Sequence, residues 1–423
     1  MKILKALTII GCILAVASLA FAGNTVKIGL NYPKTGPYHV QGLDQFRAAE
    51  LAVEEINASG GIMGKPVEIV WRDSQSKPDV SKANATDLID NEGCKMLFGG
   101  SSSGVAIAVG ELCQQKGVPF FGTLTYSTAT TGVKGHRYMF RECYDAYMAA
   151  SVLADYLKKN FAGKKYMYIT ADYTWGWTTE SSLRTSTNTT DESTHKGVKT
   201  PLGTKDFNKQ LALAKMVKPD VLVLVLFGED MVNAVRQATT MGIKNTCQIV
   251  VPNLTLGMAE GGGPKVMEGV VGSLPWCWQI PYQFGYDRGK QFVESFASKY
   301  SRYPSTSGAS AYTIVYEYKD AVERAGSFDP AEVVAALEGH SYTFLKDKQT
   351  WRDFDHQSVQ TVYAVQCKPQ AEVMKDKFKL DYFNILYSLH GDKAVISKAD
   401  WQAARTQANL PGSLEPLDEM VSK

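Results

Sequence analysis

The sequence predicts an α/β protein with two doubly wound, Rossmann-like lobes. Short apolar runs alternate with longer segments in which apolar residues recur at helical spacing. This alternation indicates parallel strands that are covered by helices on both faces. It stops near residue 121 and starts again near residue 166. A chain of 423 residues is long enough for two domains, because a domain usually takes roughly 150 residues. Since the alternation is interrupted once, we expect one sheet in each lobe.

The first half of the chain carries four expected strands. The first covers 26–30 and leads into a helix over 46–56, where apolar side chains recur every three or four residues. A glycine-rich break separates this helix from the second strand, over 67–71. The third and fourth strands are expected over 95–98 and 118–121, with a helix before each.

Three further strands are expected in the second half, over 166–170, 221–227 and 248–251. The run over 221–227 is apolar without interruption, which is typical of a strand buried on both faces of a sheet. Together the seven runs predict two parallel sheets.

Loops with polar, glycine or aromatic residues follow four of these strands, over 31–36, 99–104, 124–127 and 172–177. In open α/β sheets, ligands bind beyond the carboxyl ends of the strands, where loops and helix N-termini converge. These loops are therefore the candidate binding site, although each one alone also fits an ordinary surface loop.

The first 22 residues have the pattern of a secretory signal peptide. Lys2 and Lys5 precede an apolar run of about 17 residues, and Ala20-Phe21-Ala22 forms a small-x-small cleavage pattern. We expect cleavage after Ala22, because the run is short for a membrane span. No later run of eighteen apolar residues occurs, so no membrane insertion is expected after the signal is removed.

Charge and cysteine usage narrow the possible partners. The chain has 45 basic and 43 acidic residues without long charge runs, so no nucleic-acid partner is expected. Six cysteines follow residue 22, and they form no C-x-x-C and no zinc spacing with histidine. We expect no metal and no cofactor. The cysteines fit either disulfides, with 15 possible connectivities, or buried thiols.

The order and spacing of several short motifs resemble a known family. The region from about 26 to about 365 closely resembles the branched-chain amino-acid binding proteins of ABC transporters, which are type I periplasmic solute-binding proteins with the leucine/isoleucine/valine-binding protein as type member. The motifs that carry the resemblance are Ile28-Gly29-Leu30, Thr35-Gly36-Pro37, Leu51-Ala52-Val53-Glu54-Glu55-Ile56-Asn57, Gly60-Gly61, Gly64 and Asp73.

The resemblance implies a non-enzymatic periplasmic protein, expected as a monomer, whose lobes close on a small ligand and deliver it to permease subunits. It implies three crossovers at the hinge. Its template places the N-terminal lobe at 24–145 plus 283–350 and the C-terminal lobe at 146–282 plus 351–390. Residues 391–423 are expected to form a C-terminal extension.

In the first lobe, the resemblance implies that hydroxyl and backbone groups bind the ligand's carboxylate. The matching positions are Ser103 with Ser102 beside it, and the loop Leu124-Thr125-Tyr126. Hydroxyls and N–H groups at a helix N-terminus favour an anion, although the serines also fit simple capping of that helix. Gln41 falls where the family has a bulky residue beside the ligand.

In the second lobe, Trp175 and Phe227 take the places of family aromatics. They could sandwich an apolar side chain of the ligand, or be ordinary core residues.

One departure from the family concerns the ligand's ammonium. Where amino-acid binders of the family carry an acid, this sequence has Asn253, which supplies no negative charge. We therefore expect a branched-chain or other hydrophobic amino acid as the ligand, with an aromatic carboxylate or an amide/urea-type ligand that lacks an ammonium as the alternative. Glu229, Asp230 and Asp172 are the candidate replacements for the acid, and Trp276 and Trp278 add aromatic surface near the hinge.

Two alternatives to transport remain. Gly100-Ser101-Ser102-Ser103-Gly104 satisfies the G-x-S-x-G pattern of serine hydrolases, with Ser102 as nucleophile, but no histidine stands in a distinguishing context. A ligand-sensing receptor domain uses the same two lobes, and the absence of a membrane segment after residue 22 favours a transport partner.

Overall fold

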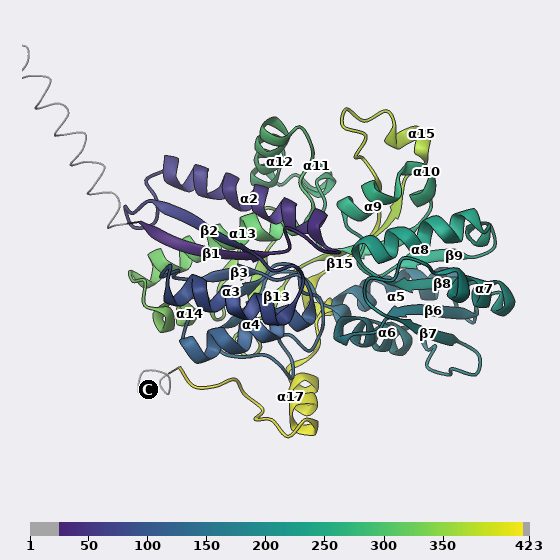
Figure 1. The fold of residues 1–423 in the computed structure, drawn as a ribbon, viewed down its shortest axis with the longest axis horizontal. Coiled ribbons are helices and arrows are strands. Elements are labelled where there is room, and N and C mark those ends of the chain that lie inside the picture. The colour runs from purple at the N-terminus through teal and green to yellow at the C-terminus, as the bar shows by residue number, and fades with distance from the viewer. Residues whose placement is uncertain (1–24, 418–423) are drawn as a thin grey trace, which may run out of the picture.

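The computed structural model of the chain describes residues 25–417. The predicted signal peptide lies outside the described residues. Figure 1 shows two groups of strands and helices side by side, the first built mostly from the early part of the chain and the second from its middle. Each group has its own central sheet flanked by helices, which confirms the predicted α/β class with two doubly wound lobes.

The sheet of the first lobe has five parallel strands in the order β2-β1-β3-β4-β5. Alternate residues of its short strands point to opposite faces. Phe98, Phe121 and Phe140 enter one buried cluster together with α2 and α13, whereas Leu97 and Phe120 enter another with α3 and α4. The bounds are β1 (Val26–Tyr32), β2 (Val67–Asp73), β3 (Leu97–Gly99), β4 (Phe120–Gly122), β5 (Met139–Arg141), α2 (His39–Ala58), α3 (Pro78–Asp90), α4 (Ser103–Lys116) and α13 (Thr306–Ala325).

The sheet of the second lobe has seven strands in the order β15-β14-β10-β9-β8-β6-β7. Five of them are parallel, and β14 and β15 join antiparallel at one edge. β8 is buried along its whole length, but it ends at Val225 because Phe227 already serves as the N-cap of α8. The strands are β6 (Tyr166–Ala171), β7 (Lys196–Thr200), β8 (Val221–Val225), β9 (Gln248–Val251), β10 (Val271–Leu274), β14 (Val362–Cys367) and β15 (Phe383–Leu389).

Helices and one short 3-10 turn connect the strands of the second lobe and cover its faces (Figure 1). They are α5 (Ala146–Phe161), α6 (Thr174–Thr187), α7 (Asn208–Val217), α8 (Gly228–Thr240), the 3-10 turn at Ile243–Asn245, α9 (Leu256–Gly262), α10 (Pro264–Met267) and α15 (Gln370–Val373).

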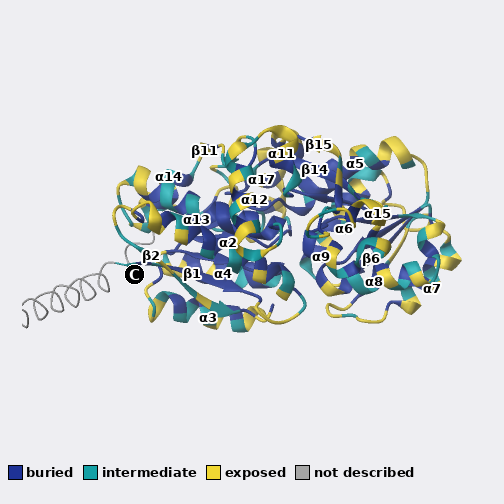
Figure 2. Cartoon of the chain, turned by 90° about the horizontal axis from the view of Figure 1, so that it is seen from above, coloured by how far each residue is buried: buried dark blue, intermediate teal, exposed yellow. Residues whose placement is uncertain are grey.

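The chain passes between the two cores three times on its way from β5 to β14. Phe140 and Cys143 lie on either side of the first passage, Trp276 and Cys277 on either side of the second, and the third leads from β12 to β14. Figure 2 shows buried residues concentrated in both sheets and in this connecting region. The remaining elements between the second passage and the end of the third are α11 (Gln279–Phe284), α12 (Asp287–Tyr300), α14 (Pro330–Leu337), β11 (Ser341–Tyr342), β12 (Gln349–Trp351) and β13 (Ser358–Val359).

After β15 the chain returns to the first lobe through α16 (Gly391–Ala394) and α17 (Lys398–Gln407). The Trp401 indole donates to the Thr131 carbonyl at 2.9 Å, and the Glu415 carboxylate lies 2.7 Å from His136 Nδ1. The segment 391–417 is therefore packed against the rest of the molecule and makes a fourth connection between the lobes.

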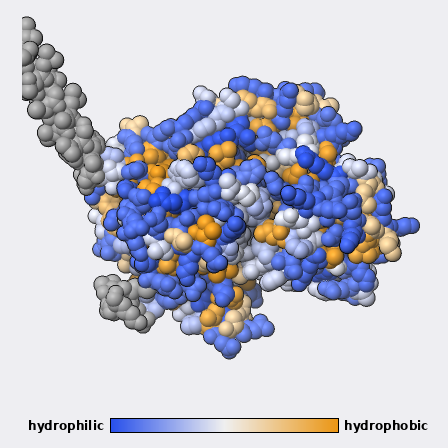
Figure 3. All heavy atoms as spheres, in the orientation of Figure 1, coloured by the Kyte–Doolittle hydropathy of each residue, from blue (hydrophilic) through white to orange (hydrophobic). Residues whose placement is uncertain are grey.

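The six cysteines of the described chain are free thiols, and five of them are buried, which matches the buried-thiol alternative. Within residues 25–417, no helix has the length and apolarity needed to cross a membrane, and no three His, Cys, Asp or Glu side chains cluster as a metal site would require. The face in Figure 3 is mainly hydrophilic with scattered apolar groups.

Candidate ligand-binding site

The predicted site residues lie between the lobes, beyond the carboxyl ends of the strands. The loops after β3 and β4 and the first turn of α2 approach from the first lobe, and the loops after β6, β8 and β9 approach from the second. All nine predicted residues are buried, from 1% exposed at Ser103 and Asn253 to 8% at Ser102.

The two lobes touch through these residues, so the structure represents a closed arrangement. The Trp175 backbone N–H donates to Ser103 Oγ at 3.2 Å, and the Gln41 amide donates to Thr255 Oγ1 at 3.4 Å. The rings of Tyr126 and Phe227 lie 5.6 Å apart between centroids. Aromatic and hydroxyl groups from both lobes thus form a shared core.

The loop after β3 places its serines through glycine geometry. Gly99 and Gly100 have φ angles of +117° and +82°, and a Cβ on Gly99 would lie 2.5 Å from the Asn31 carbonyl oxygen. Only glycine fits these conformations without strain. The turn leaves Ser102 as the N-cap of α4, where its hydroxyl accepts from the Val105 N–H at 3.3 Å. Ser103 follows and reaches the second lobe.

Two of the predicted hydroxyl groups are already engaged within the first lobe. Ser102 caps α4, and the Thr125 hydroxyl lies 3.1 Å from Thr130 Oγ1. No hydrogen bond joins Ser102 to a histidine in the described structure. Ser103 and Tyr126 are therefore the hydroxyls of this set that face the other lobe.

Four buried polar atoms at the lobe interface lack a hydrogen-bond partner among the described residues: Gln41 Oε1, Ser101 Oγ, Tyr126 OH and Asn253 Nδ2. An unsatisfied buried polar group costs roughly 1–3 kcal/mol. Burial also raises the pKa of Tyr126 well above its usual value, so its hydroxyl is neutral and can donate. The site therefore offers neutral donors and acceptors to a polar partner.

Asn253 lies at the centre of the second-lobe contribution. Its Oδ1 accepts from the Trp175 indole N–H at 3.3 Å, and the Trp175 ring lies edge-on to Phe227 with 6.0 Å between centroids. This bond fixes the amide so that its Nδ2 is the unpartnered atom. Asn253 therefore presents an N–H donor at the position where the amino-acid binders of the family carry an acid.

The three candidate replacement acids are engaged elsewhere. Asp172 accepts from the Trp177 indole at 2.8 Å on the outer surface, and Glu229 is 56% exposed with its carboxylate 3.9 Å from His39 Nδ1. Asp230 accepts from the Gly203 N–H at 2.8 Å, and burial raises its pKa to about 6. Within the described chain, none of the three bonds to a predicted site residue.

The two hinge tryptophans pack away from the site. Trp276 contacts Phe292 in the first core at 5.8 Å, and Trp278 stacks on Tyr303 at 3.9 Å between ring centroids. They are packing residues of the second passage.

The sequence missed three residues at the interface. Tyr38 is fully buried against Phe227, with 5.3 Å between ring centroids, and its hydroxyl lies 3.0 Å from that of Tyr173. Thr255 meets Gln41. Tyr173 lies within the predicted loop 172–177 without having been singled out, and Tyr38 lies just after the loop 31–36, so position along the chain was the available signal.

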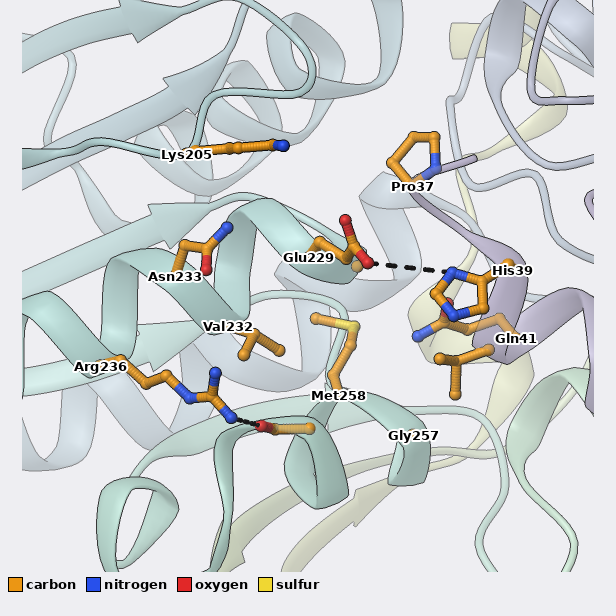
Figure 4. Close-up of a pocket in the computed structure, with 13 residues that line it drawn as sticks. Pro37, His39, Gln41, Lys205, Glu229, Val232, Asn233, Arg236, Gly257 and Met258 are labelled. Atoms are coloured by element: carbon orange, nitrogen blue, oxygen red, sulfur yellow. Dashed lines mark hydrogen bonds and ion pairs between the residues drawn. The ribbon is translucent and has the colours of Figure 1, made fainter. Parts of the chain in front are cut away.

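A hollow of about 470 Å³ opens at the rim of the lobe interface (Figure 4). It is bounded by the start of α2 on the first lobe and by α8 and α9 on the second. Gln41 belongs both to this hollow and to the buried interface.

Fold and site together define the class of two-lobe proteins with a candidate binding site between the lobes. The chain belongs to the periplasmic binding protein family, whose profile matches residues 25–372. This family consists of solute-binding components of transporters and is not enzymatic.

Relatives and solved structures support this assignment. The chain is 25% identical to Leu/Ile/Val-binding protein homolog 7 of Brucella abortus, over 76% of this chain and 82% of that protein. The crystal structure of a periplasmic binding protein from Burkholderia mallei superimposes with a TM-score of 0.81 at 25% identity, over 89% of this chain and 98% of that one. A solute-binding protein of R. palustris in complex with 4-hydroxybenzoate superimposes with a TM-score of 0.76 at 20% identity, over 87% and 98%.

Proposed function

We propose that this protein captures a small carboxylate with an apolar or aromatic body and without an ammonium group, and delivers it to an ABC transporter. The observation that carries the proposal is the composition of the lobe interface. Neutral hydroxyl and amide groups surround an aromatic core, and the candidate acids are engaged outside it. A buried ammonium would lack a counter-charge there.

The proposed binding mode uses both lobes. The ligand's carboxylate accepts from Ser103 and Tyr126 near the N-terminus of α4, where the helix favours an anion. Its apolar body packs against the rings of Trp175 and Phe227, and the Asn253 Nδ2 group donates to the ligand from the second lobe. Micromolar affinity needs only about −8 kcal/mol, which one buried ring and a few hydrogen bonds can supply.

The closed form is the species that permease subunits would recognise, because only closure brings surfaces of both lobes into a fixed relation. We propose a periplasmic location after cleavage of the predicted signal peptide, and a monomeric state. Membership of the periplasmic binding protein family supports the location.

A hydrophobic amino acid is the second candidate ligand. The name of the Brucella relative favours it. Such a ligand would place its ammonium near Asn253, whose partnerless atom is itself a donor. The geometry therefore favours the acid over the amino acid.

A thermal-shift screen tests the proposal. The panel contains leucine, phenylalanine, aromatic carboxylates, short amides and urea. Because a ligand that binds only the folded state stabilises it by RT ln(1 + [L]/Kd), we expect a rise in Tm with carboxylates that lack an ammonium. Larger shifts with leucine or phenylalanine would favour the second candidate, and no shift with any compound would contradict capture of these solute classes.

A further inference from the structure

The hollow at the rim has features of a second binding subsite. Its walls come from both lobes: His39 and Gln41 lie in α2, Glu229 and Arg236 in α8, and Lys205 in the loop before α7. Figure 4 shows Lys205 and Glu229 extending into the same open space. The volume of about 470 Å³ is sufficient for a polar group with part of a ligand body.

The hollow is complete only when the lobes are closed. Gly228 has a φ angle of +60°, and a Cβ there would lie 2.6 Å from the Pro37 carbonyl oxygen of the other lobe. A Cβ on Gly257 would likewise lie 2.7 Å from Val40 Cγ1. Glycine at both positions allows the lobes to approach closely at this rim.

The hollow adjoins the proposed ligand site at Gln41. Gln41 is 3% exposed, lines the hollow, and has an amide oxygen without a partner. Among residues 25–417, its one side-chain hydrogen bond, to Thr255 Oγ1, is long at 3.4 Å. Gly228, another lining residue, directly follows Phe227. The hollow therefore lies next to the aromatic part of the interface.

Positive charge predominates in the hollow. Lys205 and Arg236 have no carboxylate within ion-pair distance among residues 25–417, and Arg236 donates only to the Gly261 carbonyl. The opposing acid, Glu229, faces His39 at 3.9 Å (Figure 4). Two unpaired cations against one carboxylate favour an anionic guest.

We propose that this hollow is a subsite for a second anionic group, and that the ligand is a dianion with an apolar body, such as an aromatic or long-chain dicarboxylate. The inference rests on the proposed function, since it requires a first carboxylate held at Ser103 and Tyr126. Lys205 contacts the distal anion, Arg236 adds positive charge from the side of α9, and Gln41 contacts the ligand where it leaves the interface.

Calorimetric titration with matched acids tests the inference. Benzoate is compared with terephthalate, and phenylacetate with 1,4-phenylenediacetate, because each pair differs by one carboxylate-bearing group at the distal end. We expect at least tenfold tighter binding of the diacid in one pair, a loss of that preference in Lys205→Gln/Arg236→Gln, and a threefold or larger gain for the diacid in Glu229→Gln. The matched control, Lys209→Gln/Lys215→Gln on the exposed face of α7, should leave both affinities unchanged.

The outcomes separate the inference from the proposed function. Equal binding of mono- and diacids, or a diacid preference that survives Lys205→Gln/Arg236→Gln, overturns the subsite and leaves the carboxylate-binding function standing. Binding of none of the four acids, in a protein that melts cooperatively, overturns both. These substitutions lie at the rim and remove no buried contact of the core, so folding should be retained.

Discussion

Asn253 determines the choice of ligand at the scale of single residues. An acid at this position would neutralise an ammonium, whereas the asparagine presents a donor that no neighbouring group accepts. A hydrogen bond from Trp175 holds its orientation. One side chain therefore separates binding of an acid from binding of the corresponding amino acid.

Asn253→Asp should reverse this preference. The aspartate keeps an acceptor for the Trp175 indole and adds a negative charge. We expect affinity for a carboxylate ligand to fall about tenfold or more, equivalent to about 1.4 kcal/mol, while affinity for the amino acid with the same body rises. Calorimetry on both ligands measures the ratio, and an unchanged ratio would show that Asn253 does not face the ligand.

Removing the Ser103 and Tyr126 hydroxyls should weaken ligand binding more than it weakens the fold. The Tyr126 hydroxyl has no partner, so Tyr126→Phe removes an unsatisfied group. We expect Ser103→Ala/Tyr126→Phe to lower carboxylate affinity about thirtyfold or more. Each of the two lost hydrogen bonds to the charged group is worth roughly 1.5–3 kcal/mol, and water replaces part of this. The Tm without ligand should fall modestly, because Ser103→Ala removes the acceptor of the Trp175 N–H. Unchanged affinity would remove the site assignment, and Ser181→Ala on the exposed face of α6 is the control.

Sequence could locate the site residues but not their interactions. The glycine–serine turn and the aromatic loop after β6 are local patterns, so Ser103 and Trp175 could be singled out. The pairing of Tyr38 with Tyr173, and the use of the Thr125 hydroxyl by Thr130, depend on tertiary contacts between or within lobes. No local pattern contains that information.

At the scale of elements, the hinge is held by one buried lysine. Lys346 Nζ donates to the Pro275 carbonyl at 2.7 Å, Gln360 Oε1 at 2.8 Å and the Thr361 carbonyl at 2.7 Å. The Gln360 amide in turn donates to the Glu142 carbonyl. These bonds join all three passages, and burial lowers the pKa of Lys346 to about 8.

Lys346→Met should destabilise the protein by about 3 kcal/mol or more, because three buried acceptors lose their donor. Urea denaturation measures the change. Lys319→Met, which removes only a surface pair with Glu323, should cost about 0.5 kcal/mol or less. Equal effects of the two substitutions would mean that the lysine does not hold the hinge.

The strand predictions succeeded where the apolar runs were strong and failed where strands are short or polar. β5 has three residues, and β7 is largely exposed with two lysines, so neither had a strand signal. The antiparallel edge formed by β14 and β15 depends on pairing with β10 across about 90 residues, which periodicity does not reveal.

At the scale of the whole molecule, each sheet has its own buried core, and the core of the first lobe contains a buried carboxyl group. Glu317 in α13 is 5% exposed, and its carboxylate accepts from the Trp351 indole at 3.0 Å. Burial raises the pKa of Glu317 to about 8, with Asp320 adding to the effect and Arg324 opposing it. The folded protein therefore holds a proton that the unfolded chain releases near pH 4.5.

The free energy of unfolding should consequently depend on Glu317. Its proton stabilises the folded state fully below about pH 4.5, and this contribution of about 5 kcal/mol is lost as the pH rises through 8. Glu317→Gln keeps an acceptor for Trp351 and should be less sensitive to pH over this range and more stable than the wild type at pH 8. Parallel urea curves at pH 5 and pH 8 measure both, and identical pH slopes in the two proteins would contradict a raised pKa.

The central claim is that the closed lobes capture a carboxylate without an ammonium. The most direct measurement is calorimetric titration of the wild-type protein with 3-phenylpropanoate and with phenylalanine, which share a body and differ only in the ammonium. We predict micromolar binding of the acid and at least tenfold weaker binding of phenylalanine. Tighter binding of phenylalanine than of the acid would contradict the account.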